Sequence, residues 1–152
     1  MENIVGKRVS DDAEAIRNVL DKADVLWLAL TDEAGPYCVP VNFAMEEGVI
    51  YIHSGKKGRK AAILNTEAQV AFSAAVDVEA KTGDTICSYG YRFRSVAGTG
   101  IPRLLEADEA RVGLDIIIRK YAGKLMPYTD KMLAATAVYA IPMENASVRI
   151  KE

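Results

Sequence analysis

Short turns between strand-like runs constrain the fold of this chain more than any other feature. Apolar or alternating runs at 24–31, 36–44 and 49–54 are joined by "DEAG" (32–35) and "EEG" (46–48). Parallel neighbours need a crossover of a dozen or more residues, so turns this short join antiparallel strands. Further strand-like runs lie at 69–80, 91–100, 136–143 and 146–150. We expect an α+β, mainly β fold, because six or seven antiparallel strands in a small domain close most easily into a barrel.

Three segments predict helices around this sheet. They are residues 10–23, 58–66 and 107–122. Ser10 or Asp11 is the expected N-cap of the first, and Gly123 is the expected stop of the last. The segment 81–90 is expected to be loop, at least in part. With 152 residues, the chain is long enough for one domain, residues 1–152, and too short for two ordinary ones.

Two positions in the first strands carry specific expectations. The run 24–31 is nearly continuously apolar, which suits a strand buried on both faces, with Trp27 in the core. Pro40 lies inside the second run and cannot donate a ladder hydrogen bond. We therefore expect Pro40 on a sheet edge, or at a break where backbone groups are free to bind something else.

Composition excludes several classes of function. The net charge of −2 gives no overall attraction to nucleic acid or to an anionic membrane. No apolar stretch approaches the ~20 residues that cross a bilayer, and acidic residues precede any long apolar run at the N-terminus, which predicts no signal peptide. Cys38 and Cys87 match no zinc or CxxC spacing and there is one histidine, so we expect no metal site. A cytoplasmic protein with reduced thiols is the expectation.

One stretch, "YIHSGKKGRK" (51–60), concentrates positive charge against this acidic background. Its four cations fall within five positions, and they are Lys56, Lys57, Arg59 and Lys60. We call them the cation cluster. A strand ending at Ser54, followed by a helix that starts near Gly58, offers free amides and a hydroxyl to an anion. A solvated basic turn explains the same residues equally well, so the local pattern leaves both interpretations open.

Other motifs are weaker. The glycines around the cation cluster do not have Walker A spacing, and "GTGIPR" (98–103) lacks the third glycine and the βαβ context of a Rossmann fingerprint. His53 has no partner at the spacing of a hydrolase triad, which leaves it as a hydrogen-bond donor or a proton donor near neutral pH. Arg92 and Arg94 share one strand face, either exposed or turned toward an anion.

Three motifs in order carry a family resemblance: "VPVNF" (39–43), "YIHSGKKGRK" (51–60) and "YRFRSVAGTG" (91–100). Together they resemble the pyridoxamine 5′-phosphate oxidase-like flavin-binding split barrels, and within them the 5-nitroimidazole resistance group. The resemblance covers about residues 7 to 122. It implies an antiparallel six-stranded split β-barrel with peripheral helices, forming a homodimer with FMN at the interface.

The resemblance also implies roles for individual residues. Ser54, Gly58, Arg59 and Lys60 would hold the FMN phosphate. Val41 and Asn42 would line the isoalloxazine, His53 would lie beside the cofactor or substrate, and Ser95 would approach the flavin site. The C-terminal "MENASVRIKE" lacks the substrate-binding signature of true pyridoxamine phosphate oxidases, so that oxidation itself is not expected.

The function that this resemblance implies is that of an FMN-binding oxidoreductase that reduces a nitroaromatic or similar small electrophile, with His53 as the catalytic residue. The alternative is a non-catalytic flavin-binding or electron-carrier protein. The electron donor stays open, as does the replacement of FMN by a deazaflavin or haem that related split barrels allow.

Overall fold

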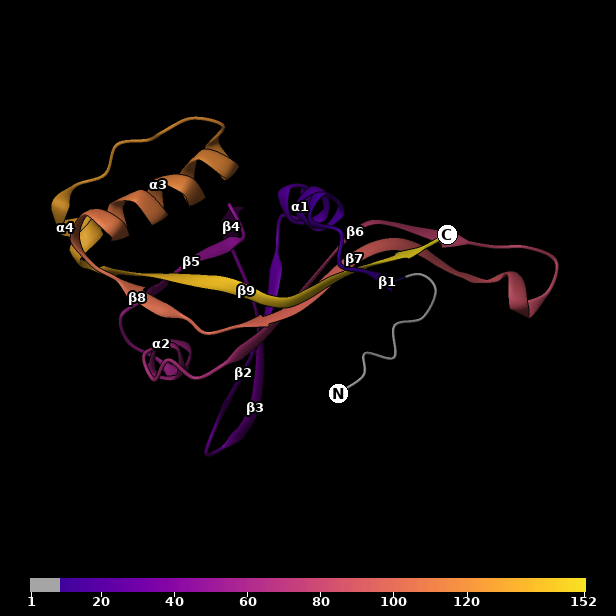
Figure 1. The fold of residues 1–152 in the computed structure, drawn as a ribbon, viewed down its shortest axis with the longest axis horizontal. Coiled ribbons are helices and arrows are strands. Elements are labelled where there is room, and N and C mark those ends of the chain that lie inside the picture. The colour runs from indigo at the N-terminus through magenta and orange to yellow at the C-terminus, as the bar shows by residue number, and fades with distance from the viewer. Residues whose placement is uncertain (1–8) are drawn as a thin grey trace.

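The computed structural model describes residues 9–152 and has a curved antiparallel sheet at its centre (Figure 1). The expectation of no signal peptide rests partly on residues 1–8, which lie outside this range. The strands are β1 (Val9–Ser10), β2 (Leu26–Asp32), β3 (Gly35–Val41), β4 (Phe43–Glu46), β5 (Val49–Gly55), β6 (Val70–Lys81), β7 (Gly90–Gly100), β8 (Arg103–Leu105) and β9 (Thr136–Lys151).

The sheet confirms the expected split barrel. Its order is β3-β2-β6-β7-β9-β5-β4, and β1 and β8 add to β9. Strands β3 and β4 are one stretch of chain interrupted at Asn42, so the path uses six strand-forming stretches. They occupy the two ends of the order and are not paired with each other, so the sheet stays open between them. Pro40 lies on the edge strand β3, one residue before its end, as its missing N–H predicts.

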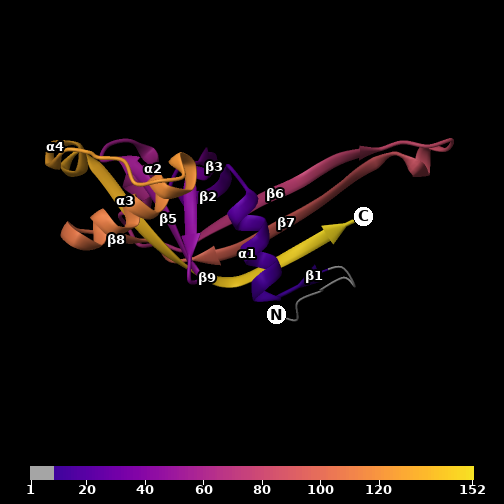
Figure 2. The ribbon, with the colours of Figure 1, turned by 90° about the horizontal axis from the view of Figure 1, so that it is seen from above.

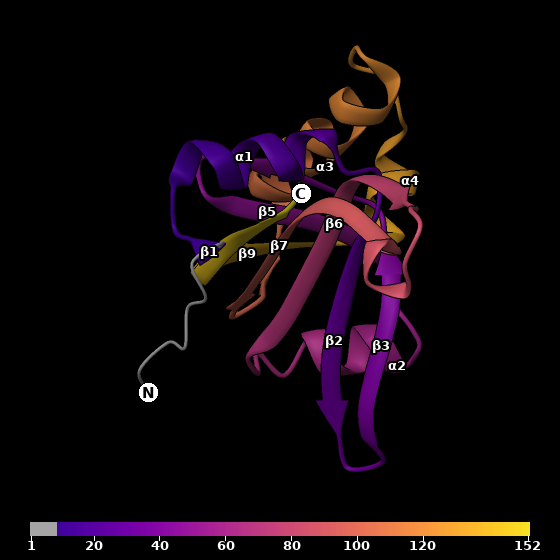
Figure 3. The same cartoon turned by 90° about the vertical axis from the view of Figure 1, so that its right-hand side faces the viewer.

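Strand β2 is buried on one face only, so the expectation of burial on both faces was wrong. Leu26, Leu28 and Leu30 point into the core, whereas the alternate side chains face outward. Trp27 is 51% exposed and is not a core residue. The reason is that its inner face packs into the main core, which contains residues of two helices and of β5 and β9, whereas the outer face of β2 and β3 is turned to the viewer and uncovered in Figure 3.

The helices are α1 (Ala13–Lys22), α2 (Arg59–Leu64), α3 (Ala107–Ala122) and α4 (Asp130–Ala134), with a 3₁₀ turn at Ile86–Ser88 inside the expected loop. The N-cap of α1 is Asp12, not Ser10 or Asp11, and its carboxylate accepts from the Ala15 N–H at 3.0 Å. Ser10 instead accepts from the Asp12 N–H at 3.0 Å. The N-cap therefore lies one or two residues later than expected. The helix α4 was not expected, because five residues are too few for a periodic signal.

Helix α3 packs on the opposite face of the sheet from the main core. Its Ala110 joins a second apolar cluster with Leu105 and Val138. Gly113 allows this close approach, since an added Cβ would lie 3.0 Å from Val138. The helix ends at Gly123 with a left-handed φ of 73°, as expected. None of the helices described for residues 9–152 is long and apolar enough to cross a membrane.

Strand β9 holds the two parts of the sheet together. The two expected runs, 136–143 and 146–150, form this single strand because Met143 and Glu144 stay paired with β7. Close packing explains both glycines of "GTG". A Cβ at Gly100 would lie 2.6 Å from the Pro142 carbonyl oxygen, and one at Gly98 would lie 2.6 Å from the Phe72 ring. Beyond the body, the β6–β7 hairpin projects as a long arm (Figure 2).

Candidate functional site

The cation cluster lies where β5 passes into α2. Gly58 is the N-cap of α2 with φ of 107°, a conformation that favours glycine, and it turns the chain so that the helix begins at Arg59. Lys56, Lys57 and Arg59 are exposed, and Lys60 is half-buried. The sequence order strand–serine–glycine–helix is therefore confirmed at this point of the fold.

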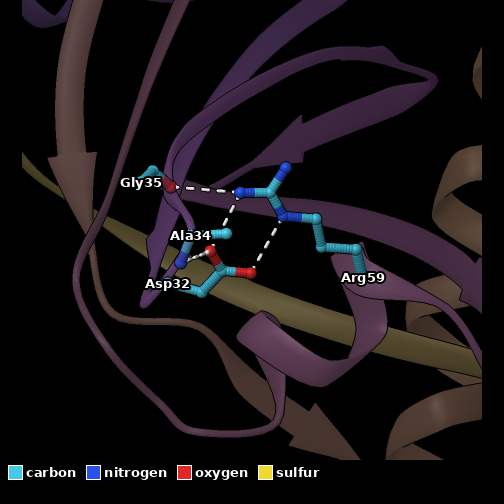
Figure 4. A network of polar contacts seen from close by, with 4 residues as sticks. All are labelled: Asp32, Ala34, Gly35 and Arg59. Atoms are coloured by element: carbon cyan, nitrogen blue, oxygen red, sulfur yellow. Dashed lines mark hydrogen bonds and ion pairs between the residues drawn. The ribbon is translucent and has the colours of Figure 1, made fainter.

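Arg59 is held by the turn between β2 and β3 (Figure 4). Its Nε donates to Asp32 Oδ2 at 2.9 Å, and its Nη2 donates to Asp32 Oδ1 at 2.9 Å and to the Gly35 carbonyl at 3.2 Å. The guanidinium also lies over the Tyr37 ring, 4.4 Å from its centroid. The hydrogen bond from Arg59 lowers the pKa of Asp32, and that of Arg59 is raised in turn, so both groups are charged at neutral pH.

This ion pair changes what Arg59 offers to a ligand. The two-bond edge that would grip a phosphate is already directed at Asp32. The third nitrogen, Nη1, points away from Asp32 and Gly35 (Figure 4). Arg59 as placed here therefore has one nitrogen to offer rather than a fork.

Ser54 is buried, on the same face of β5 as Ile50 and Ile52. Its hydroxyl donates to the adjacent Gly55 carbonyl at 2.8 Å. In this arrangement the hydroxyl proton is not offered to an anion, and the phosphate role of Ser54 stays a prediction.

His53 lies on the other face of β5, opposite Val138 of β9. Burial, and to a lesser degree the charge of Lys60, lowers the pKa of His53 below its usual 6.5. The imidazole is therefore neutral at pH 7 and can donate one N–H hydrogen bond. This favours the hydrogen-bonding role over that of a protonated acid.

The break between β3 and β4 is braced by the end of α3. The Tyr121 hydroxyl accepts from the Phe43 N–H at 3.0 Å and donates to the Asp24 carbonyl at 2.7 Å. Val41 is buried in the core and Asn42 is exposed at the break. The irregularity that Pro40 predicts is thus present, and the Tyr121 hydroxyl bonds to the Phe43 N–H that follows the break.

The structure gathers some of the expected site residues and separates others. His53, Ser54, Gly58, Arg59 and Lys60 follow one another through the end of β5 and the start of α2. Arg59 also reaches the turn at one end of β3, and Asn42 follows the other end.

Ser95 is not part of this group. It pairs with Arg149, near the end of β9, whereas His53 pairs with Val138, near the beginning of that strand. Within one chain, the sheet therefore keeps Ser95 away from the cation cluster, and its role stays a prediction.

Sequence reasoning missed Asp32, Tyr37 and Tyr121. The acidic turn "DEAG" predicts a connection between strands, and nothing in it identifies a partner at position 59. Tyr121 lies at the end of the helix predicted over 107–122, but an apolar period does not show that its hydroxyl bonds to Phe43, and its side chain is 42% exposed.

A cleft of about 750 Å³ lies beside the cation cluster, between the start of α3, α4 and β9. Lys56 forms part of its wall, and Leu105 and Ala110 form part of its apolar surface. Its size is that of a small-molecule site. Several of its polar groups are already paired, including Arg111 with Asp130 at 3.1 Å.

Comparison with protein families gives a match over most of the chain. The family model described as pyridoxamine 5′-phosphate oxidase matches residues 12–150. A search among proteins with curated functions found no match.

Solved structures with the same fold include several from bacteria. A candidate 5-nitroimidazole antibiotic resistance protein from Bacteroides thetaiotaomicron is 29% identical, with a TM-score of 0.83 over 93% of this chain and 86% of that one. An FAD- and haem-binding protein from Mycobacterium smegmatis is 22% identical, with a TM-score of 0.88 over 96% and 74%. The flavocytochrome Anf3 from Azotobacter vinelandii is 20% identical, with a TM-score of 0.80 over 97% and 72%.

Proposed function

The chain belongs to the pyridoxamine 5′-phosphate oxidase family, and on this premise we propose that it binds FMN and uses it as an oxidoreductase. The observation that carries the proposal is the cation cluster at the start of α2, beside a strand whose far end is broken at Asn42. The three lysines of the cluster would give a phosphate its counter-charge, and Arg59 Nη1 would add a hydrogen-bond donor. The break leaves Asn42 outside both β3 and β4.

The spacing of these features suits an elongated ligand. Strand β3 has seven residues, and its ends lie about 20 Å apart at roughly 3.3 Å per residue. We infer that the phosphate lies near Lys60 and Arg59 Nη1, and that the ring system lies toward Val41 and Asn42. These residues would fix the position of the cofactor, and electron transfer is the chemistry that bound FMN supplies.

We further propose that the protein is a homodimer. The outer face of the β2–β3–β6 region leaves Trp27 and several small side chains uncovered. Covering such a face is favourable by the hydrophobic effect. Because one chain keeps Ser95 apart from His53, two copies are needed if Ser95 is to reach a cofactor held at the cation cluster.

The proposed substrate is a nitroaromatic or a similar small electrophile. The 29% identity to the Bacteroides thetaiotaomicron protein supports this class. The neutral imidazole of His53 would donate a hydrogen bond that orients the substrate's polar group. His53 is half-buried, which would limit competition from water.

The first test is the visible spectrum of the purified protein, with chromatography of the cofactor released on denaturation. FMN is expected. If FAD or haem, the groups bound by the Mycobacterium smegmatis relative, is found instead, that group replaces FMN in the proposal. A colourless protein that binds no added flavin would refute the proposal.

The second test is stopped-flow reoxidation of the reduced flavoprotein. A nitroimidazole is expected to accelerate reoxidation over oxygen alone. A flavoprotein without this acceleration would instead be an electron carrier or a flavin-binding protein without turnover.

A further inference from the structure

We propose that Asp32 is a positioning residue, which presets Arg59 so that Nη1 alone meets the anionic end of the cofactor. This inference rests on the proposed flavin binding and adds a residue to it. It assigns a role to the β2–β3 turn, which otherwise only joins two strands.

The guanidinium of Arg59 is fixed in both position and orientation. An arginine side chain has five N–H donors, and three of them are used here by Asp32 and the Gly35 carbonyl. The Tyr37 ring, 4.4 Å away, supports the guanidinium plane from one side. All four contacts come from the β2–β3 hairpin, so this hairpin and not helix α2 decides where the charge lies.

Asp32 is itself held in place. Its Oδ1 accepts from the Ala34 N–H at 2.9 Å, and the β2–β3 register sets it opposite Gly35. The carboxylate is therefore an anchored partner, not a mobile surface acid. About a third of each side chain is exposed, so a ligand can still approach.

Arg59 differs in this respect from the rest of the cation cluster. Among residues 9–152, the ion pairs found do not include Lys56, Lys57 or Lys60. Those lysines must lose rotamer freedom when they bind an anion, whereas Arg59 has already lost it. Arg59 therefore offers a hydrogen-bond donor in a fixed orientation, and the lysines add positive charge.

The alternative is that Asp32 competes with the bound anion, because a carboxylate and a phosphate would both accept hydrogen bonds from Arg59. The two roles predict opposite signs. Removal of Asp32 lowers phosphate affinity if Asp32 positions Arg59, and raises it if Asp32 competes.

The experiment measures dissociation constants of FMN and riboflavin, by flavin fluorescence, for the wild type, Asp32→Ala and Asp32→Asn. Riboflavin lacks the phosphate, so it reports on the ring site alone. Loss of one preorganised side chain is expected to weaken FMN binding about three- to tenfold. Riboflavin affinity should stay within about twofold, which also shows that the variants fold.

Glu33→Gln is the matched control, since Glu33 is an exposed acid in the same turn and is not a partner of Arg59. It removes the same charge and should not weaken FMN binding. In an Arg59→Ala background, Asp32→Ala should have no further effect on FMN. In the ligand-free protein, the Arg59 Nε–H resonance should be protected from solvent exchange in the wild type and not in Asp32→Ala.

Unchanged or increased FMN affinity in Asp32→Ala would overturn the inference, as would an equal loss of riboflavin affinity. If the wild type binds FMN, either result refutes only the role of Asp32 and leaves the proposed flavin binding intact. A wild type that binds no flavin overturns the proposed function and this inference with it.

Discussion

Lys120 is expected to make the fold more stable as the pH rises from 8 to 9.5. Its Nζ donates to the Leu20 carbonyl at 3.1 Å and to the Ala23 carbonyl at 2.6 Å, and it lies 3.6 Å from the centre of the Phe43 ring. It thereby joins the end of α1 to the strand that follows the break at Asn42. A change in the protonation of Lys120 therefore alters its contacts with both α1 and β4.

The direction of this stability change follows from the lowered pKa of Lys120. Burial lowers the pKa of Lys120 to about 8, although Asp21 and Asp24 raise it in part. In the unfolded chain the amine has its ordinary pKa near 10.4. Between these values the unfolded state binds more protons than the folded state, so the free energy of unfolding rises with pH. Below about pH 8 the amine is charged in both states and the folded state carries the full burial cost.

The magnitude is moderate. A shift of one pKa unit corresponds to about 1.4 kcal/mol, so the step from pH 8 to 9.5 contributes at most about 2 kcal/mol. The side chain is half-exposed, and solvent screening reduces this to about 1 kcal/mol. Tyr51, Tyr121 and Tyr139 have raised pKa values and would titrate above this window.

The assay is urea denaturation of the wild type and Lys120→Met at half-unit intervals of pH. Methionine keeps most of the length without the charge, so the difference between the two proteins isolates Lys120. The wild type should gain about 1 kcal/mol relative to the variant across the window. Parallel pH profiles, or a relative loss for the wild type, would refute the reasoning.

Four further outcomes are expected. Lys60→Ala should weaken FMN binding by about 1.5–3 kcal/mol and leave riboflavin binding unchanged. Equal losses of affinity for both flavins in titrations would show that the phosphate does not bind at Lys60. His53→Ala should reduce the rate of nitroimidazole-dependent reoxidation, measured by stopped flow, more than it reduces FMN affinity, measured by titration. A loss of FMN affinity alone would show that His53 only binds the cofactor. Gly100→Ala should cost about 1–3 kcal/mol in urea denaturation through overpacking, and Gly90→Ala, where a Cβ meets only a distant lysine tip, should cost much less. Trp27→Glu should shift the protein toward monomer in light scattering, and an unchanged mass would place the dimer contact on another face.

Local patterns accounted for most of the architecture. Turns of three or four residues required antiparallel neighbours, and the helix over 107–122 was predicted at its observed bounds because its apolar period and Gly123 agree. Pro40 predicted a sheet edge or a break; it lies on the edge strand β3, and a break follows at Asn42. These features succeed because they depend on backbone chemistry within a few residues.

Other features were decided by distant contacts. Trp27 lies in an apolar run, but which face of β2 is buried depends on which helices and strands pack against it. The N-cap of α1 is Asp12 and not Ser10, because Ser10 is part of strand β1 and pairs with Val148 of β9. The two C-terminal runs merged because pairing with β7 continues through Glu144.

The cation cluster illustrates the same division. The sequence by itself determined that four cations follow a strand and a glycine, and that this arrangement suits an anion. Only the tertiary structure decided that Arg59 is tied to Asp32, which lies in a different turn of the chain, and that Ser54 faces inward. The physical reason is that a hydrogen bond between remote residues depends on the register and packing of the strands that carry them, and no local pattern records these.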